Sequence, residues 1–223
     1  MKTLKNISAY QSIIFDCDGV ILNSNHIKTQ AFFNVTKKYG IDYATNLQEY
    51  HILKGGISRY EKFDYFFREI LKRKPVKNEM DQILNNFSLN VKNQLLDCEV
   101  EKSLLKFREI SPDALWVVVS GGDQDELREV FDKRKLSKNF NGGIYGSPRN
   151  KYEIMDDLIS SGEVSNKSLF IGDSEYDAKV ASNFKLDFVF LSQWTDVHNW
   201  ESKYKDCSFA NIDELIESLH VIE

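Results

Sequence analysis

The sequence has few cysteines, no excess of basic residues and no long apolar run. Its 223 residues include three cysteines without metal-ligand spacing, so we expect reduced thiols rather than disulfides or a zinc site. The net charge of −5 argues against a nucleic-acid-binding protein, which usually carries a basic patch. No apolar run approaches the roughly 18 residues of a membrane helix, and the N-terminus lacks the apolar stretch of a signal peptide. We therefore expect a cytoplasmic protein that binds neither nucleic acid nor a membrane.

What the sequence does contain is a series of short apolar runs separated by helical patterns. The runs are β-branched or aromatic and nearly continuous, which is typical of parallel strands covered on both faces. They are Ser12–Phe15, Leu115–Val119, Leu169–Ile171 and Phe188–Leu191. Helical patterns over Asp123–Phe131 and Lys151–Ile159 separate the later runs. This alternation predicts an α/β fold with a doubly wound, Rossmann-like parallel sheet.

A long helical stretch separates the first two predicted strands. Its amphipathic patterns cover Ile27–Tyr39, the residues after Ser58, and Met80–Leu95. Such apolar stripes can pack on one another in a small bundle, and the chain is long enough for a core with a smaller second unit. We predict an α/β core over residues 1–22 and 100–223 and a helical cap domain over residues 23–99.

Two carboxylates follow the first predicted strand. Asp16 and Asp18 are two residues apart, so their side chains should point roughly the same way, and Gly19 lets the backbone turn tightly. Paired carboxylates at a strand tip suit a metal-assisted reaction with one nucleophile and one acid. Taken alone, the motif is equally consistent with an acidic turn. An EF-hand fits poorly, because Val20-Ile21-Leu22 offers no side-chain oxygens.

Polar residues also follow the other predicted strands, at the sheet edge where ligands bind in this fold class. Ser120 and Gly121 can hold an anion with a hydroxyl and backbone N–H groups, although a plain strand-to-helix loop also explains them. Lys151 begins a predicted helix, where it either reaches a phosphate or lies on the surface. Asp173 and Asp177 are four residues apart, on one face of a first helical turn. With Asp16 they suit a hard cation, but a helix N-terminus favours acids without a metal as well.

In combination these motifs resemble the haloacid dehalogenase-like hydrolase superfamily over nearly the whole chain. The family's four motifs appear in order as Asp16-Cys17-Asp18-Gly19-Val20, Ser120 after an apolar strand, Lys151, and Gly172-Asp173-Ser174-Glu175-Tyr176-Asp177. The helical insertion is similar to the C1 cap of the branch that includes phosphoglycolate phosphatase and beta-phosphoglucomutase.

The resemblance implies roles for the acidic residues. Asp16 would be the nucleophile that forms an aspartyl phosphate, and Asp18 would protonate the leaving alcohol and then activate water. Mg²⁺ would lie between Asp16, the backbone carbonyl of Asp18 and Asp173, while Asp177 would hold a metal-bound water. The cation would let a carboxylate approach an anionic phosphoryl group.

The resemblance also implies residues that bind the substrate. Ser120, Gly121 and Lys151 would bind the phosphoryl oxygens. The loop before the second cap helix is similar to the one with which beta-phosphoglucomutase handles its sugar phosphate. Its candidate specificity residues are Lys54, Gly56 and Arg59. The same loop ends in a capping box, S-x-x-E from Ser58 to Glu61, which explains those two residues as a helix start.

Two positions favour one branch of the superfamily. Asp18 indicates phosphoryl transfer, since the dehalogenases do not use a second aspartate there. The mutase has a histidine twelve residues after its nucleophile, where this chain has Lys28, with His26 out of register. We therefore expect a Mg²⁺-dependent phosphatase for a small phosphorylated metabolite, such as a sugar phosphate, a polyol phosphate or a phosphoglycolate-like compound. A sugar-phosphate mutase and a non-catalytic binding protein are the alternatives, and a monomer or weak dimer is expected.

Overall fold

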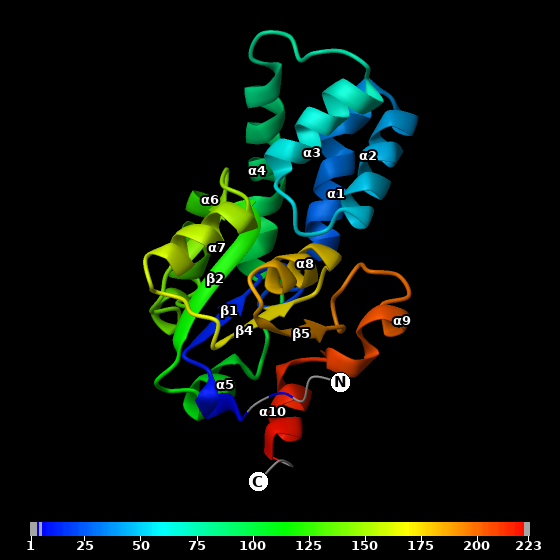
Figure 1. Ribbon diagram of the computed structural model, residues 1–223. Coiled ribbons are helices and arrows are strands. Elements are labelled where there is room, and N and C mark those ends of the chain that lie inside the picture. The colour runs from blue at the N-terminus through cyan, green and yellow to red at the C-terminus, as the bar shows by residue number, and fades with distance from the viewer. Residues whose placement is uncertain (1–3, 5, 221–223) are drawn as a thin grey trace.

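The computed structural model describes residue 4 and residues 6–220. In this part of the chain the sheet has six parallel strands in the order β3-β2-β1-β4-β5-β6 (Figure 1). The strands are β1 (Ser12–Phe15), β2 (Leu115–Asp123), β3 (Ile144–Ser147), β4 (Ser168–Gly172), β5 (Asp187–Leu191) and β6 (Ser208–Phe209).

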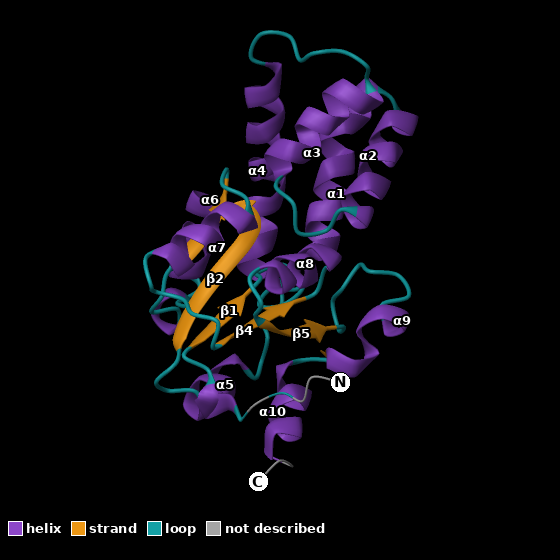
Figure 2. Ribbon diagram, in the orientation of Figure 1, coloured by secondary structure: helices purple, strands orange, loops and turns teal. Residues whose placement is uncertain are grey.

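Helices cover both faces of the sheet, which explains why the central residues of the strands are apolar in nearly continuous runs (Figure 2). Ile13 and Phe15 belong to one core, while Ile14 between them belongs to the other. Helices α5 (Leu104–Ile110), α6 (Gln124–Lys133) and α10 (Ile212–His220) contribute to the first core, and α7 (Lys151–Ser160) and α8 (Glu175–Asn183) to the second. A short α9 (Glu201–Tyr204) precedes β6. The predicted α/β, doubly wound parallel fold is confirmed.

The structure differs from the expected elements around the second strand. That strand was expected to end at Val119, but β2 continues to Asp123 because its last residues pair with β3, which the sequence patterns did not reveal. Ser120 and Gly121 therefore lie inside a strand, and the expectation of a loop just before a helix was wrong. Asp123 is the N-cap of α6 rather than its first residue.

Residues 23–99, which we call the cap segment, form helices that lie together beyond the carboxyl ends of the strands (Figure 1). They are α1 (Asn25–Thr36), α2 (Ile41–Leu53), α3 (Arg59–Tyr65) with a π-helical turn over Phe66–Ile70, and α4 (Glu79–Asp97). Helix α2 was not expected from the sequence. The rings of Phe32, Phe63 and Phe87 pack together with centroids 4.4–5.7 Å apart, so the amphipathic stripes face one another. The division into a core and a cap domain stays a prediction, which this arrangement supports.

The two ends of the cap segment lie side by side. Leu22 and Val100 form an antiparallel bridge, and the amide of Asn23 donates to the carbonyl of Glu99 at 2.9 Å. The chain therefore enters and leaves the cap segment at one point, close to the tip of β1. Within the described residues, no helix has the length and apolar character that a membrane span requires.

Candidate active site

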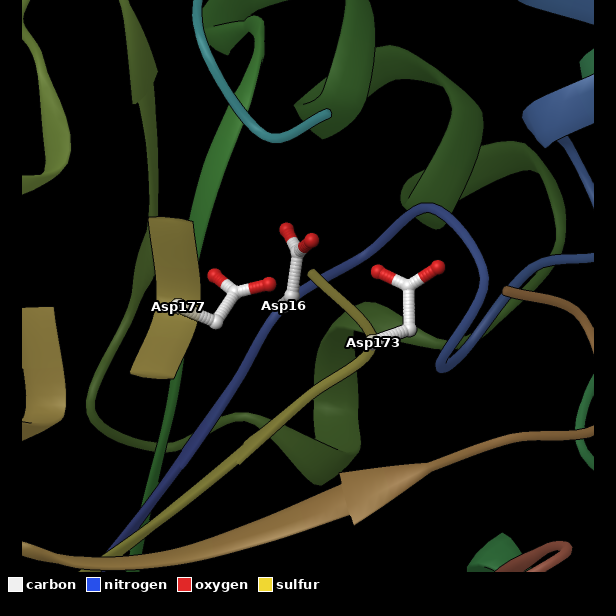
Figure 3. A group of neighbouring side chains, drawn as sticks. All are labelled: Asp16, Asp173 and Asp177. Atoms are coloured by element: carbon white, nitrogen blue, oxygen red, sulfur yellow. The ribbon is translucent and has the colours of Figure 1, made fainter. Parts of the chain in front are cut away.

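Three buried carboxylates meet at the carboxyl edge of the sheet (Figure 3). Asp16 directly follows β1 and Asp173 directly follows β4, and these neighbouring strands are paired in register from Ser12 to Phe15. Asp177 comes from the first turn of α8. One oxygen from each residue lies within 4.8 Å of the others. The sequence prediction that these three residues come together is confirmed.

The second and third carboxylates are fixed by different neighbours. Asp173 Oδ2 accepts a hydrogen bond from Asn25 Nδ2 at 2.7 Å. Asp177 Oδ2 accepts one from Ser174 Oγ at 2.6 Å, as part of a reciprocal capping box. The spacing of Asp173 and Asp177 had suggested that both lie in a first helical turn. Because α8 begins at Glu175, Asp173 instead lies in the loop before the helix. The two carboxylates still converge, since the loop folds back against the helix start.

A single lysine lies between two of these carboxylates. Lys151 Nζ is 2.8 Å from Asp16 Oδ1 and 2.5 Å from Asp177 Oδ1, and the side chain is fully buried. Burial, followed by the charge of Asp177, raises the pKa of Asp16 to about 7. Burial and then Asp16 also raise the pKa of Asp173 well above its usual value. One ammonium does not offset three buried carboxylates, so the group is suited to a cation, and its all-oxygen donor set fits Mg²⁺.

Gly19 permits the close packing of the loop after β1 on the carboxylate of Asp173. Its φ is +76°, and a Cβ atom added there would lie 2.0 Å from Asp173 Oδ2. Both the backbone conformation and the space exclude a side chain at this position. The glycine therefore brings the Asp18-Gly19 backbone against the acidic group, as its place in the motif had predicted.

Asp18 has different partners from Asp16. Its carboxylate pairs with Lys28 Nζ of α1 and accepts a hydrogen bond from Ser24 Oγ at 2.5 Å. Burial alone would raise the pKa of Asp18, but Lys28 outweighs it and lowers the pKa. The carboxylate does not belong to the acidic group, so only its backbone carbonyl remains as a predicted metal ligand. The sequence had noted Lys28 only as a departure from a family histidine, and the structure shows it at the site.

The predicted phosphate-binding residues on β2 are closely packed. Ser120 is fully buried, and its Oγ accepts the Gly122 N–H at 3.0 Å, so that amide already has a partner. A Cβ atom on Gly121 would lie 2.2 Å from the Gly56 carbonyl oxygen, which shows how closely the cap segment approaches the core here. That Ser120, Gly121 and Lys151 bind phosphoryl oxygens stays a prediction.

The acidic group opens into a cavity of about 50 Å³ between the core and the cap segment. Gly56 and Arg59 line it, but the Arg59 guanidinium pairs with Glu126 of α6, at 2.5 and 3.1 Å. Lys54 is exposed and lines an outer pocket on the other side of the loop. The cap-side lining also includes His51 and Lys62, which the sequence analysis did not identify. Lys62 precedes Phe66 by four residues and therefore lies on the apolar face of the helix. A lysine on an apolar face was the signal in the sequence that could have identified it.

Comparison with known proteins agrees with this geometry. A family model described as haloacid dehalogenase-like hydrolase matches residues 13–191. The chain belongs to this family. The predicted resemblance is thereby confirmed, although no curated protein is significantly similar to the chain in sequence.

Solved structures of the family share the fold at low identity. Beta-phosphoglucomutase from Clostridium difficile is 18% identical, with a TM-score of 0.72 over 96% of this chain and 100% of that one. A predicted phosphatase from Clostridium acetobutylicum is 17% identical, with a TM-score of 0.72 over 95% of this chain and 99% of that one. CbbY from Rhodobacter sphaeroides, solved with phosphate, is 15% identical, with a TM-score of 0.73 over 95% of this chain and 99% of that one.

Proposed function

We propose that this protein is a Mg²⁺-dependent phosphatase that hydrolyses a small phosphorylated metabolite through an aspartyl-phosphate intermediate. The observation that carries the proposal is the buried group of Asp16, Asp173 and Asp177, with Asp18 lining the same cavity. The group offers a nucleophile, a cation site and an acid in one enclosed space. Family membership supports the reaction class.

Asp16, Asp173 and Asp177 would hold the metal ion. A bound divalent cation would offset the negative charge that opposes attack of a carboxylate on a phosphate ester. In the protein alone, burial and then the neighbouring carboxylates raise the pKa values of Asp16 and Asp173. A cation at this position would favour their ionised forms, and the nucleophile must be ionised to react.

The protein's own residues account for both half-reactions. An oxygen of the Asp16 carboxylate forms a bond to phosphorus while the ester P–O bond breaks. Asp18, whose pKa Lys28 lowers in the free protein, must take up a proton in the substrate complex, and it gives that proton to the departing oxygen. Water then attacks the aspartyl phosphate and loses a proton to Asp18, which frees inorganic phosphate and restores Asp16. Lys151 contacts the nucleophile and would offset charge on the phosphoryl oxygens.

The test is hydrolysis of p-nitrophenyl phosphate by the full chain with Mg²⁺, and again after excess chelator. We expect turnover only with the metal, and a loss of at least about 1,000-fold, or roughly 4 kcal/mol, in Asp16→Asn. Asp156→Asn, an exposed aspartate of α7, is the matched control and should behave as the parent. Full turnover in chelator, or Asp16→Asn activity within tenfold of the parent, would contradict the proposal.

A sugar-phosphate mutase is the second candidate. It is supported by the similarity of the loop over residues 53–59 to that of beta-phosphoglucomutase and by the shared fold. Phosphorus NMR separates the two on a hexose 1-phosphate, because a phosphatase releases inorganic phosphate and a mutase forms the 6-phosphate. Absence of any turnover in the presence of Mg²⁺ would leave a non-catalytic binding protein.

A further inference from the structure

The cap side of the cavity holds a buried lysine without an acidic partner. Lys62 of α3 is 2% exposed and lines the same cavity as Asp16. Among the described residues, no carboxylate oxygen lies within 4.0 Å of its ammonium group. Lys62 Nζ instead contacts His51 Nδ1 at 2.6 Å and lies 5.5 Å from the centroid of the Phe32 ring.

The other cations around this cavity are paired. Lys28 pairs with Asp18, and Arg59 pairs with Glu126. Behind the nucleophile, Lys151 contacts two carboxylates of the acidic group. Lys62 is thus the exception among the cations described at this site. An unpaired buried charge is unfavourable, so its position calls for a compensating group.

The neighbouring histidine does not supply that compensation. Burial, followed by the charges of Lys62 and Lys28, lowers the pKa of His51 well below its usual range. A neutral imidazole can accept a hydrogen bond from the ammonium but carries no negative charge. Burial and then Lys28 lower the pKa of Lys62 itself to about 7, and the more distant carboxylates of Asp18, Glu61 and Asp16 only partly offset this effect.

We propose that Lys62 binds a carboxylate on the leaving group, and that the substrate is a short phosphorylated hydroxy acid. This inference rests on the proposed phosphatase function. With the phosphoryl group at Asp16, the leaving group extends across the cavity toward the cap segment, where Lys62 meets it. A single unpaired ammonium balances the one charge of a carboxylate, whereas a second phosphoryl group would bring nearly two charges.

The test compares two-carbon phosphate esters that differ only in the far group. Ethyl phosphate has a neutral leaving group, 2-phosphoglycolate carries a carboxylate, and ethylene glycol bisphosphate carries a second phosphoryl group. We expect the parent to prefer 2-phosphoglycolate in kcat/KM. Lys62→Met should lower kcat/KM for 2-phosphoglycolate roughly 10- to 100-fold more than for ethyl phosphate, the usual effect of losing a charged hydrogen bond. Lys62→Arg should keep part of the preference.

A matched control and a binding measurement complete the test. Lys37→Met removes an exposed lysine from the same cap segment and should keep the preference. Calorimetry on Asp16→Asn in Mg²⁺ should show 2-phosphoglycolate binding at least tenfold more weakly when Lys62→Met is added. Thermal unfolding of each variant verifies that it is folded.

The results of these experiments distinguish a failure of the phosphatase proposal from a failure of the role of Lys62. If the parent hydrolyses none of these esters or p-nitrophenyl phosphate with Mg²⁺, the phosphatase proposal fails and this inference falls with it. Hydrolysis without a preference for 2-phosphoglycolate, or a preference that Lys62→Met retains, overturns only the role of Lys62. Faster turnover of the bisphosphate than of 2-phosphoglycolate overturns the carboxylate assignment.

Discussion

Lys28 of α1 forms a partly buried ion pair with Asp18 in the loop after β1. The pair joins the cap segment to the residue proposed as the acid of the reaction. Ser24 Oγ donates to the other oxygen of the same carboxylate, so both oxygens of Asp18 are held by residues at the entrance to the cap segment. The position of the acid therefore depends on the position of α1.

Lys28→Met should slow the hydrolysis of ethyl phosphate more than that of p-nitrophenyl phosphate. A poor alkoxide leaving group needs a well-placed proton donor, whereas a nitrophenolate departs without one. We expect at least a tenfold larger loss in kcat on the alkyl ester, and partial recovery in Lys28→Arg. Steady-state kinetics on both esters provide the measurement. Equal losses would show that Lys28 acts on the site as a whole and not through Asp18.

The Arg59–Glu126 pair should stabilise the contact between cap segment and core. The sequence suggested Arg59 as a substrate contact, but its guanidinium is 4% exposed and already paired. Arg59→Ala or Glu126→Ala alone should lower the free energy of unfolding by about 3–5 kcal/mol, because each leaves a buried charge unpaired. The double variant should lose much less than the sum of the two.

Urea unfolding measures this coupling, and a surface pair of the cap segment is the control. Arg68 pairs with Asp64 in the same segment, but both side chains are about half exposed. Arg68→Ala should therefore leave the free energy of unfolding close to that of the parent. Additive losses from Arg59→Ala and Glu126→Ala would show that the two residues act independently.

Gly19→Ala should abolish metal binding, while a matched glycine elsewhere should not. Gly162 has nearly the same φ, +79°, but nothing lies within 4 Å of an added Cβ atom. Gly162→Ala should therefore show only the backbone cost of about 1–2 kcal/mol. Gly19→Ala meets the same cost and also displaces Asp173. The increase in Tm on adding Mg²⁺ should persist in Gly162→Ala and vanish in Gly19→Ala. If Gly19→Ala still shows the increase in Tm on adding Mg²⁺, Asp173 is not a ligand of the metal.

Lys62→Met should raise the stability of the protein although it impairs the proposed substrate binding. The pKa of Lys62 is about 7 in the folded protein, below the usual lysine value of 10.5, so between these values the unfolded chain binds more protons. The stability of the parent should therefore rise with pH across this window. Lys62→Met lacks this dependence, so its advantage, on the order of a few kcal/mol, should be greatest below pH 7 and shrink toward pH 10. If the difference in Tm between Lys62→Met and the parent were constant across this pH range, Lys62 would not carry a buried charge.

The sequence was sufficient to predict the elements whose signal is local. The first strand is correct because its four residues are all buried between two helical layers. The acidic group was also predictable, since parallel strands deliver their carboxyl ends to one edge and each carboxylate follows directly or within the next turn. Strand β6 has only two residues, too short for any pattern to indicate.

Interactions between distant segments could not be read from local patterns. The extension of β2 to Asp123 depends on pairing with β3. Arg59 was assigned to substrate from the similarity of its loop to that of beta-phosphoglucomutase, and no local pattern indicated its partner Glu126, which lies 67 residues away. Lys28 and Lys62 acquire their roles only when the cap segment lies on the core. Residues that act across this boundary are specified by tertiary packing, and the sequence indicates only that they are charged residues in apolar helices.

The bridge between Leu22 and Val100 brings the two ends of the inserted helices together. Because both ends of the insertion meet at one place, a different insertion with closely spaced ends would fit there without altering the strand order of the sheet. The acidic residues belong to the part of the chain that would stay, and Lys62 belongs to the part that would be exchanged. A replaced insertion would therefore change the contacts with the leaving group, and it would also have to supply again the contacts that Ser24, Asn25 and Lys28 make with Asp18 and Asp173.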